Sequence, residues 1–285
     1  MSKIIDGKAV SAYLRQEIKN EVEKLILDHN VQPGLAVILV GTDPASTVYV
    51  RNKHKACEAT GIRSVSIELP ATVSEDEVLL KIDELNRDDT IHGILVQLPL
   101  PKHIDEKKVI NAISPAKDVD AFHPENVGRI MTGDYKFLPC TPAGIISLLD
   151  YYKVEIEGKS CVIIGRSNIV GKPMAHLLLE RNGTVTVAHS RTKDLKATAS
   201  QADILVVAIG KPELINSEYV KEGAVVIDVG INRKSDGRLV GDVDFESVKD
   251  KVSLITPVPG GVGPMTITTL LRNTLMSAKT SLNKA

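Results

Sequence analysis

Short, entirely apolar runs alternate with longer amphipathic segments along most of the chain, and this alternation severely restricts the possible folds. Apolar residues recur at helical spacing between Val10 and Leu25, whereas residues 35–40 form one continuous apolar run. Apolar strands separated by helices are typical of parallel sheets covered by helices on both faces. The sequence therefore predicts an α/β protein.

The first part of the pattern predicts one parallel-sheet lobe. Asp6 is a suitable N-cap for the first helix, and a second helix is expected to begin after Asp43 with Pro44 and to end at Gly61. Further strands are expected at residues 64–69 and 93–96, and further helices near residues 75–85 and 106–113.

A second series of strands predicts a second lobe, in agreement with the length of 285 residues, because one core rarely serves so long a chain. A hinge is expected around residues 139–142, and a final helix over 265–278 is expected to return to the first lobe. The predicted domains are residues 1–140 with 265–285, and residues 141–264, with the active-site cleft between them. The strands expected in the second lobe are 161–164, 184–188, 204–208, 224–229 and 252–255.

A glycine-containing turn opens the second lobe. Gly165, Ser167 and Gly171 follow an apolar strand and precede a helix whose apolar residues begin at Met174. Such a turn lets a pyrophosphate approach the backbone, and the N–H groups and dipole of the next helix stabilise the anion. An ordinary strand-to-helix turn is the alternative. The regular flanks favour a dinucleotide site in a Rossmann-like NAD(P)-binding lobe.

The segment after the next strand indicates which dinucleotide is bound. NAD sites usually place an acidic residue about 20 residues beyond the glycines, to accept a hydrogen bond from the ribose 2′-hydroxyl. This chain has His189, Ser190, Arg191 and Thr192 there instead. Hydroxyls and a guanidinium bind a 2′-phosphate with charge assistance, so NADP is predicted. The alternative is that Arg191 and Arg166 are solvated surface residues.

Composition excludes several other classes of protein. The net charge of −1 and the absence of tryptophan argue against nucleic-acid binding. No apolar run approaches the roughly 20 residues of a membrane span, and the first residues are expected to enter a helix rather than a signal peptide. Three widely spaced cysteines indicate reduced thiols, so we expect a cytoplasmic protein. No metal site is expected, because no metal-ligand spacing occurs.

Candidate chemical groups lie in the first lobe. Ser46, Tyr49 and Lys53 fall on one face of the helix that follows Pro44, although a Tyr and a Lys four residues apart more often form a solvated face. Gln97 directly follows an apolar strand and so stands at its carboxyl end, the edge where ligands bind in open α/β sheets.

Two acidic residues follow in the same lobe. Asp118 and Asp120 could accept hydrogen bonds from a heterocycle, or could simply pair with Lys117. Near the other end of the chain, residues 257–264 contain three glycines and three prolines. That segment either joins a strand to a helix or lets a flat ligand lie against bare backbone.

Taken together, these stretches resemble the bifunctional methylenetetrahydrofolate dehydrogenase/methenyltetrahydrofolate cyclohydrolase family. Ala121 and Ala188 depart from the family pattern, which commonly has Gly and Cys at these positions. The matching stretches are 49–53 (YVRNK), 93–99 (GILVQLP), 117–120 (KDVD), 139–142 (PCTP), 165–171 (GRSNIVG), 228–232 (DVGIN) and 257–266 (PVPGGVGPMT).

The resemblance implies an enzyme of one-carbon metabolism that oxidises 5,10-methylenetetrahydrofolate with NADP and then hydrolyses the methenyl product to 10-formyltetrahydrofolate. It implies that Lys53 is the general acid/base, with Gln97 tuning it, Tyr49 packing on the folate and Asp120 orienting the pterin. The implied folate-lining residues are Val96, Gln97, Leu98, Pro259, Gly260, Gly261, Val262 and Gly263. The implied NADP contacts are Gly165, Arg166, Ser167, Ser190, Arg191 and Ile231.

Other interpretations remain open from the sequence. A dehydrogenase of the same architecture acting on another substrate, such as a shikimate-type enzyme, would have no reason to keep Tyr49, Lys53 and Gln97 together. A non-catalytic NADP-binding module and a monofunctional dehydrogenase of the same family are further alternatives, although monofunctional members are expected to lack the lysine. The resemblance also suggests a homodimer, formed through an exposed edge strand of the cofactor lobe.

Overall fold

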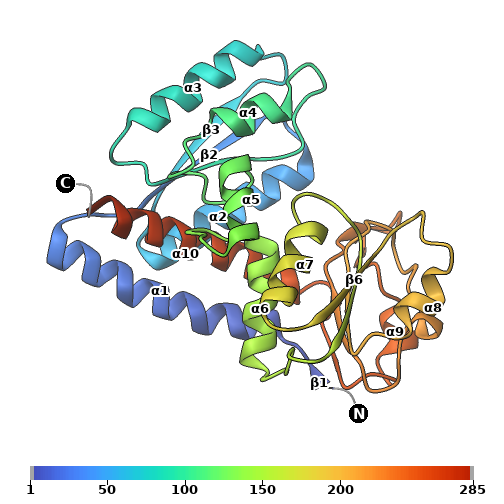
Figure 1. Ribbon diagram of the computed structural model, residues 1–285. Helices are drawn as coiled ribbons and strands as arrows, with labels where there is room; N and C mark the ends of the chain where they lie inside the picture. Colours follow the sequence, from blue (N-terminus) through green and yellow to red (C-terminus); the bar gives the residue numbers. More distant parts are fainter. Residues whose placement is uncertain (1–2, 283–285) are drawn as a thin grey trace. The chain divides into compact units, whose positions relative to one another are not determined.

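The computed structural model describes residues 3–282 (Figure 1), and the chain divides into two compact units. One, the six-strand unit, contains the chain up to Ala12 and residues Thr141–Thr266. The other, the three-strand unit, contains Tyr13–Cys140 and the chain from Ile267 onward. The boundaries therefore fall within the first and last long helices and at the start of the helix that begins at Cys140.

The three-strand unit is built on a parallel sheet in the order β3-β2-β4, with β2 (Gly34–Val40) between β3 (Arg63–Leu69) and β4 (Gly93–Val96). Alternate residues of β2 supply two cores. Leu35, Val37 and Leu39 pack with residues of α1 (Gly7–His29), α2 (Pro44–Thr60) and α10 (Val262–Leu282). The intervening residues of β2 pack with α3 (Glu75–Arg87) and α4 (Glu106–Ala112), on the opposite face (Figure 1).

The end signals of α2 act as the sequence predicts. Asp43 caps the helix, because its carboxylate accepts a hydrogen bond from the Ser46 N–H at 2.8 Å. Gly61 ends it in a left-handed conformation with φ +76°. Both predicted boundaries of this helix are confirmed, and with them the register that places Tyr49 and Lys53 on one face.

The six-strand unit contains a wholly parallel sheet in the order β1-β11-β8-β7-β5-β6. β5 (Ser160–Ile164) pairs with β6 (Thr184–Ala188) on one side and with β7 (Ile204–Val207) on the other. The strand that follows β6 in the chain therefore lies on the opposite side of β5, and the order of the strands reverses there. Ligands of doubly wound sheets bind at the carboxyl ends of the strands at such a reversal. The predicted α/β class with two parallel sheets is confirmed.

The remaining elements complete both units. In the six-strand unit these are β1 (Lys3–Ile4), α6 (Cys140–Tyr151), α7 (Gly171–Glu180), α8 (Leu195–Ala199), η1 (Ser217–Tyr219), β8 (Val225–Asp228), β9 (Asn232–Arg233), β10 (Leu239–Val240), α9 (Phe245–Val248) and β11 (Leu254–Ile255). The three-strand unit also contains α5 (Pro124–Thr132). No helix among residues 3–282 is long and apolar enough to cross a membrane.

Three sequence expectations differ from the structure. The first residues form β1, which pairs in parallel with β11, so this segment joins the six-strand unit instead of the expected first domain. The segment expected as a hinge, 139–142, does contain the boundary between the units, after Cys140, but from Cys140 onward it forms the start of helix α6. The final helix runs from Val262 to Leu282 and is longer than expected at both ends, and from Ile267 onward it belongs to the three-strand unit, as predicted. Residues 1–2 and 283–285 of the expected first domain lie outside the described residues.

Candidate functional site

A buried amine lies at the carboxyl end of the three-strand sheet. Lys53 is 7 % exposed, and its Nζ donates a hydrogen bond to Oε1 of Gln97 at 2.9 Å. The Gln97 amide is held in this orientation because its Nε2 donates to the Leu98 carbonyl at 2.8 Å. The oxygen of Gln97 therefore faces the lysine, and α2 and the end of β4 together position the pair.

The surroundings of Lys53 favour its neutral form. Burial lowers the pKa of Lys53, and the nearby Asp120 charge opposes that shift only in part. A neutral amine accepts a proton and an ammonium returns it, so a lysine with a lowered pKa suits acid–base chemistry near neutral pH. Tyr49 lies one turn earlier on α2, half-buried, and burial raises the pKa of its phenol.

The two aspartates that the sequence left undecided have different environments. Asp118 is 2 % exposed, and its carboxylate accepts hydrogen bonds from the N–H groups of Phe122 and His123 and from the side chain of Asn126. It holds the loop together. Lys117 donates instead to three backbone carbonyls at the end of α3.

Asp120 belongs to the Lys53 cluster. Burial raises the pKa of the Asp120 carboxyl, while the nearby Lys53 charge and a hydrogen bond with Cys140 act in the opposite direction. The next residue, Ala121, is fully buried and has φ +57°, a left-handed conformation that glycine adopts without strain. This backbone geometry explains why a family would use glycine there.

Cys140 is the member of this cluster that sequence reasoning missed. The sequence places Cys140 among three reduced thiols, in an expected hinge and in a stretch shared with the family, but gives it no role in the site. In the structure its thiol contacts the Asp120 carboxyl and lies 3.4 Å from the Val119 carbonyl oxygen. Burial and the Asp120 charge raise the pKa of Cys140 well above its usual range. The available signal was a cysteine close to two prolines at the start of a helix. This pattern does not indicate which side chains the thiol would meet.

The glycine turn of the six-strand unit follows β5 directly. Gly165 has φ +130°, and a Cβ on it would lie 2.3 Å from the Ala208 carbonyl oxygen, so only glycine fits. The Ser167 hydroxyl accepts hydrogen bonds from the N–H groups of Val170 and Gly171, at 3.2 and 3.3 Å. Ser167 thus holds the turn that leads into α7, which a glycine in its place could not do.

The expected 2′-phosphate contacts lie in a turn after β6. The N–H of Arg191 donates to Nδ1 of His189, and the Thr192 hydroxyl accepts from the His189 N–H. The side chains of Ser190 and Arg191 are exposed, as are those of Arg166 and Ser167 in the preceding glycine turn. Ile231, which follows β8, is 45 % exposed. These residues line the carboxyl-terminal edge of one sheet.

The glycine-rich segment 257–263 belongs to the six-strand unit, where residues 257–261 join β11 to α10 and residues 262–263 begin the helix. Val96 and Leu98 belong to the three-strand unit. The Gly260 carbonyl accepts a hydrogen bond from the Lys8 N–H, and a Cβ on Gly7 would lie 1.8 Å from the Gly261 oxygen. This close contact explains the glycine at position 7, while the φ of +109° at Gly260 explains the glycine at that position.

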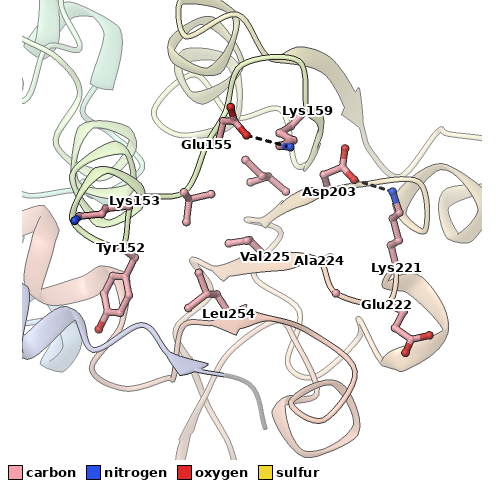
Figure 2. Close-up of a pocket in the computed structure, with 13 residues that line it drawn as sticks. Tyr152, Lys153, Glu155, Lys159, Asp203, Lys221, Glu222, Ala224, Val225 and Leu254 are labelled. Carbon is pink, nitrogen blue, oxygen red and sulfur yellow. Dashed lines mark hydrogen bonds and ion pairs between the residues drawn. The ribbon is translucent and has the colours of Figure 1, made fainter.

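The opposite, amino-terminal edge of the six-strand sheet also carries a hollow, with a volume of about 360 Å³ (Figure 2). Two ion pairs lie in its lining: Glu155 with Lys159, and Asp203 with Lys221. No cluster that could hold a metal ion occurs within residues 3–282.

A doubly wound parallel sheet with a glycine turn at its reversal, joined to a second α/β unit with a buried amine, defines a two-unit dehydrogenase of the NAD(P)-binding class. Comparison with family models specifies the family. Residues 5–120 match the catalytic domain of tetrahydrofolate dehydrogenase/cyclohydrolase, and residues 139–282 match the NAD(P)-binding domain of the same family. The chain belongs to this family, which confirms the resemblance and the predicted enzyme class.

Known relatives agree over their full length. A protein named Bifunctional protein FolD from Halalkalibacterium halodurans is 62 % identical over 276 residues, which is 97 % of this chain and 98 % of the relative. The crystal structure of the bifunctional FolD enzyme from Campylobacter jejuni superposes with a TM-score of 0.96 at 52 % identity, covering 99 % of this chain and all of the other. The Trypanosoma brucei enzyme, whose structure contains NADP and an inhibitor, gives 0.95 at 42 % identity, covering 99 % and 98 % of the two chains.

Proposed function

We propose that the chain oxidises 5,10-methylenetetrahydrofolate with NADP and hydrolyses the resulting methenyl cation to 10-formyltetrahydrofolate, with Lys53 as the general acid/base. The observation that carries this proposal is the buried Lys53 amine, which is hydrogen-bonded to an oriented Gln97 and faces Asp120. Family membership and the bifunctional names of the relatives support both activities.

The first reaction needs little chemistry from the protein. Hydride leaves the methylene carbon for the nicotinamide, and the cation that remains is delocalised over the two folate nitrogens. NADP supplies the hydride acceptor when bound, and the protein binds and orients the two rings and excludes water. We assign Tyr49 to packing on the folate, Asp120 to the pterin, and Val96, Leu98 and residues 259–263 to the substrate lining.

The second reaction requires a proton to move twice. Water adds to the methenyl carbon, and neutral Lys53 takes a proton from that water. The resulting ammonium then gives a proton to the ring nitrogen as the carbon–nitrogen bond breaks. The hydroxyl proton passes to solvent as the formyl C=O forms, so the neutral amine is restored and one proton is released overall. Gln97 accepts a hydrogen bond from either form of the amine and so keeps it in place through both steps.

NADP is proposed as the cofactor because the turn at residues 189–192, directly after β6, has exposed hydroxyl and guanidinium groups and no acidic residue. We assign the cofactor to Gly165, Arg166, Ser167, Ser190, Arg191 and Ile231, and hence to residues 141–264 of the six-strand unit. Arg191→Ala is expected to raise the KM for NADP by roughly 10- to 100-fold and to leave the KM for NAD nearly unchanged, because a charge-assisted hydrogen bond is lost. Equal losses with both nucleotides would contradict the 2′-phosphate assignment.

The proposed role of Lys53 is tested with Lys53→Met. Loss of a general acid/base is expected to reduce the hydrolysis rate by about 10²- to 10⁴-fold, measured as decay of the methenyl chromophore. NADP binding should remain, because the cofactor residues lie in the other unit. Lys55→Met is the matched control, since Lys55 is an exposed lysine on the same helix. Full hydrolysis by Lys53→Met would remove this residue from the mechanism.

We also propose that the protein is a cytoplasmic homodimer that associates through β6. This strand is the outer strand of the six-strand sheet, and Val187 on it and Leu179 on α7 are 39 % and 59 % exposed. An edge strand with exposed apolar neighbours is a template for pairing with a second copy. Three buried, unpaired cysteines support a reducing compartment. Sedimentation of a Val187→Lys variant as a dimer would contradict the β6 interface.

A further inference from the structure

Two buried carboxylates lie at the carboxyl-terminal edge of the six-strand sheet, and every donor recorded for them is uncharged. Asp242 is fully buried. Its Oδ2 accepts hydrogen bonds from the N–H groups of Ile209 and Gly210, at 2.7 and 2.9 Å. Its Oδ1 accepts from the Lys211 N–H at 2.8 Å and from Nδ2 of Asn232 at 2.9 Å. One carboxylate therefore gathers four donors from two separate segments.

Asp228, at the end of β8, links the same region to a third segment. Its Oδ1 accepts from the N–H groups of Gly230 and Asp242, at 3.0 and 2.9 Å, and its Oδ2 accepts from the Val243 N–H at 2.9 Å. The contact between the segments is close, because a Cβ on Gly230 would lie 2.3 Å from Cγ of Asp242. The two segments are therefore packed directly against each other and share hydrogen bonds.

The segments joined in this way are the ones that follow the strands at the ligand-binding edge. Residues 209–211 follow β7, next to the reversal at β5, and residues 230–232 follow β8. Ile231, a proposed NADP contact, lies between Gly230 and Asn232, and both of these neighbours are bonded to the two aspartates. Burying a carboxylate is expensive unless hydrogen bonds satisfy it. Here the hydrogen bonds that offset this cost also hold the two loops in place.

We propose that Asp242 is a positioning residue for the dinucleotide, which holds the segments 209–211 and 230–232 in the arrangement that the nicotinamide half of NADP binds. This inference rests on the proposed NADP site. Asp242 acts through the backbone and through Asn232, and does not itself touch the reacting atoms.

The test is Asp242→Asn, which keeps the size of the side chain but turns one acceptor into an NH₂ group that faces backbone N–H donors. The KM for NADP is expected to rise by roughly 10-fold or more, since hydrogen bonds to a charged acceptor are lost. Cyclohydrolase activity on added methenyltetrahydrofolate, assayed without NADP, should stay at the wild-type rate, because Lys53 lies in the other unit. A merely structural role for Asp242 would lower the dehydrogenase and cyclohydrolase activities together and would not produce this difference.

Asp203→Asn is the matched control. Asp203 accepts a hydrogen bond from the Ser160 N–H and pairs with Lys221, but it lies at the opposite edge of the same sheet (Figure 2). This variant should leave the KM for NADP unchanged. An unchanged KM in Asp242→Asn, or a parallel fall of both activities, would overturn the proposal.

Asn232→Ala decides the matter if Asp242→Asn does not fold. It removes one of the four donors and frees only the segment that contains Ile231, so a rise of about threefold or more in the KM for NADP is expected. An unchanged KM in this variant overturns the inference. Failure of the proposed function would be recognised by a different result, because the wild-type enzyme itself would then reduce no NADP with methylenetetrahydrofolate.

Discussion

Asp120 in the three-strand unit and Asp242 in the six-strand unit are both aspartates near the carboxyl ends of parallel strands, but their partners differ. Asp242 accepts four hydrogen bonds from amide donors and so has its acceptor capacity filled. Asp120 instead faces an amine and a thiol that can each change protonation state. The hydrogen-bond donors around an aspartate, rather than the carboxylate itself, therefore decide whether it holds the backbone in place or takes part in acid–base chemistry.

The largest difference between the two aspartate sites is expected from Lys53→Arg. This change keeps the positive charge next to Asp120 but removes the base, because a guanidinium does not lose its proton at accessible pH. Hydrolysis of the methenyl substrate should fall by about 10³-fold. Thermal unfolding of the variant should report whether the fold is kept, and near-normal hydrolysis would show that charge alone suffices.

A second prediction concerns the pH dependence of stability. Burial and the neighbouring Asp242 raise the pKa of Asp228 to about 7 from an ordinary value of 3.8. Since the folded-state pKa is raised, the stability from protonated Asp228 is fully present below pH 3.8 and is lost as the pH rises through 7. That loss is on the order of 4 kcal/mol.

Denaturant unfolding between pH 4 and 8 measures this effect as a difference between the wild type and Asp228→Asn. The variant should lack the corresponding part of the decline. Parallel curves for the two proteins would mean that the three N–H donors keep Asp228 ionised throughout, as in an ordinary carboxylate cradle.

Gly241→Ala tests how tightly the aspartate cluster is packed. A Cβ at this position would lie 1.7 Å from Oδ2 of Asp228, so the cluster has to shift. We expect the free energy of unfolding to fall by about 3 kcal/mol, with loss of dehydrogenase before cyclohydrolase activity. Gly128→Ala is a control in open space on α5. Tolerance of alanine at position 241 would argue for a loosely held cluster.

The smallest effect is expected for Asp120→Asn on the pH profile of hydrolysis. The Asp120 charge raises the pKa of Lys53 against the lowering caused by burial. Removing that charge should therefore move the rising limb of the hydrolysis rate toward lower pH. A rising limb displaced to higher pH would show that Asp120 does not stabilise the ammonium form of Lys53. Asp134→Asn, at an exposed site, is the control, and its pH profile should match that of the wild type.

Local signals predicted much of the fold. The ends of α2 were readable because Asp43, Pro44 and Gly61 act within one turn of the helix. The strand β1 was missed, because two residues carry no periodicity and form a strand only by pairing with β11, some 250 residues away. Cys140 was missed as a neighbour of Lys53 for the same reason, since the two residues are far apart in the sequence and come near each other only in the folded three-strand unit.

The sequence by itself determined the α/β class, the glycine turn after β5 and the presence of a lysine and a glutamine at the carboxyl edge of a small sheet, because these depend on spacing along one or two elements. Only the tertiary structure decided that Asp118 holds a loop while Asp120 faces Lys53, and that Asp228 and Asp242 share donors from three segments. The physical reason is that hydrogen bonding and desolvation depend on which groups meet in space. Asp118 and Asp120 are chemically identical and only two positions apart, so the sequence alone does not show which of them meets Lys53.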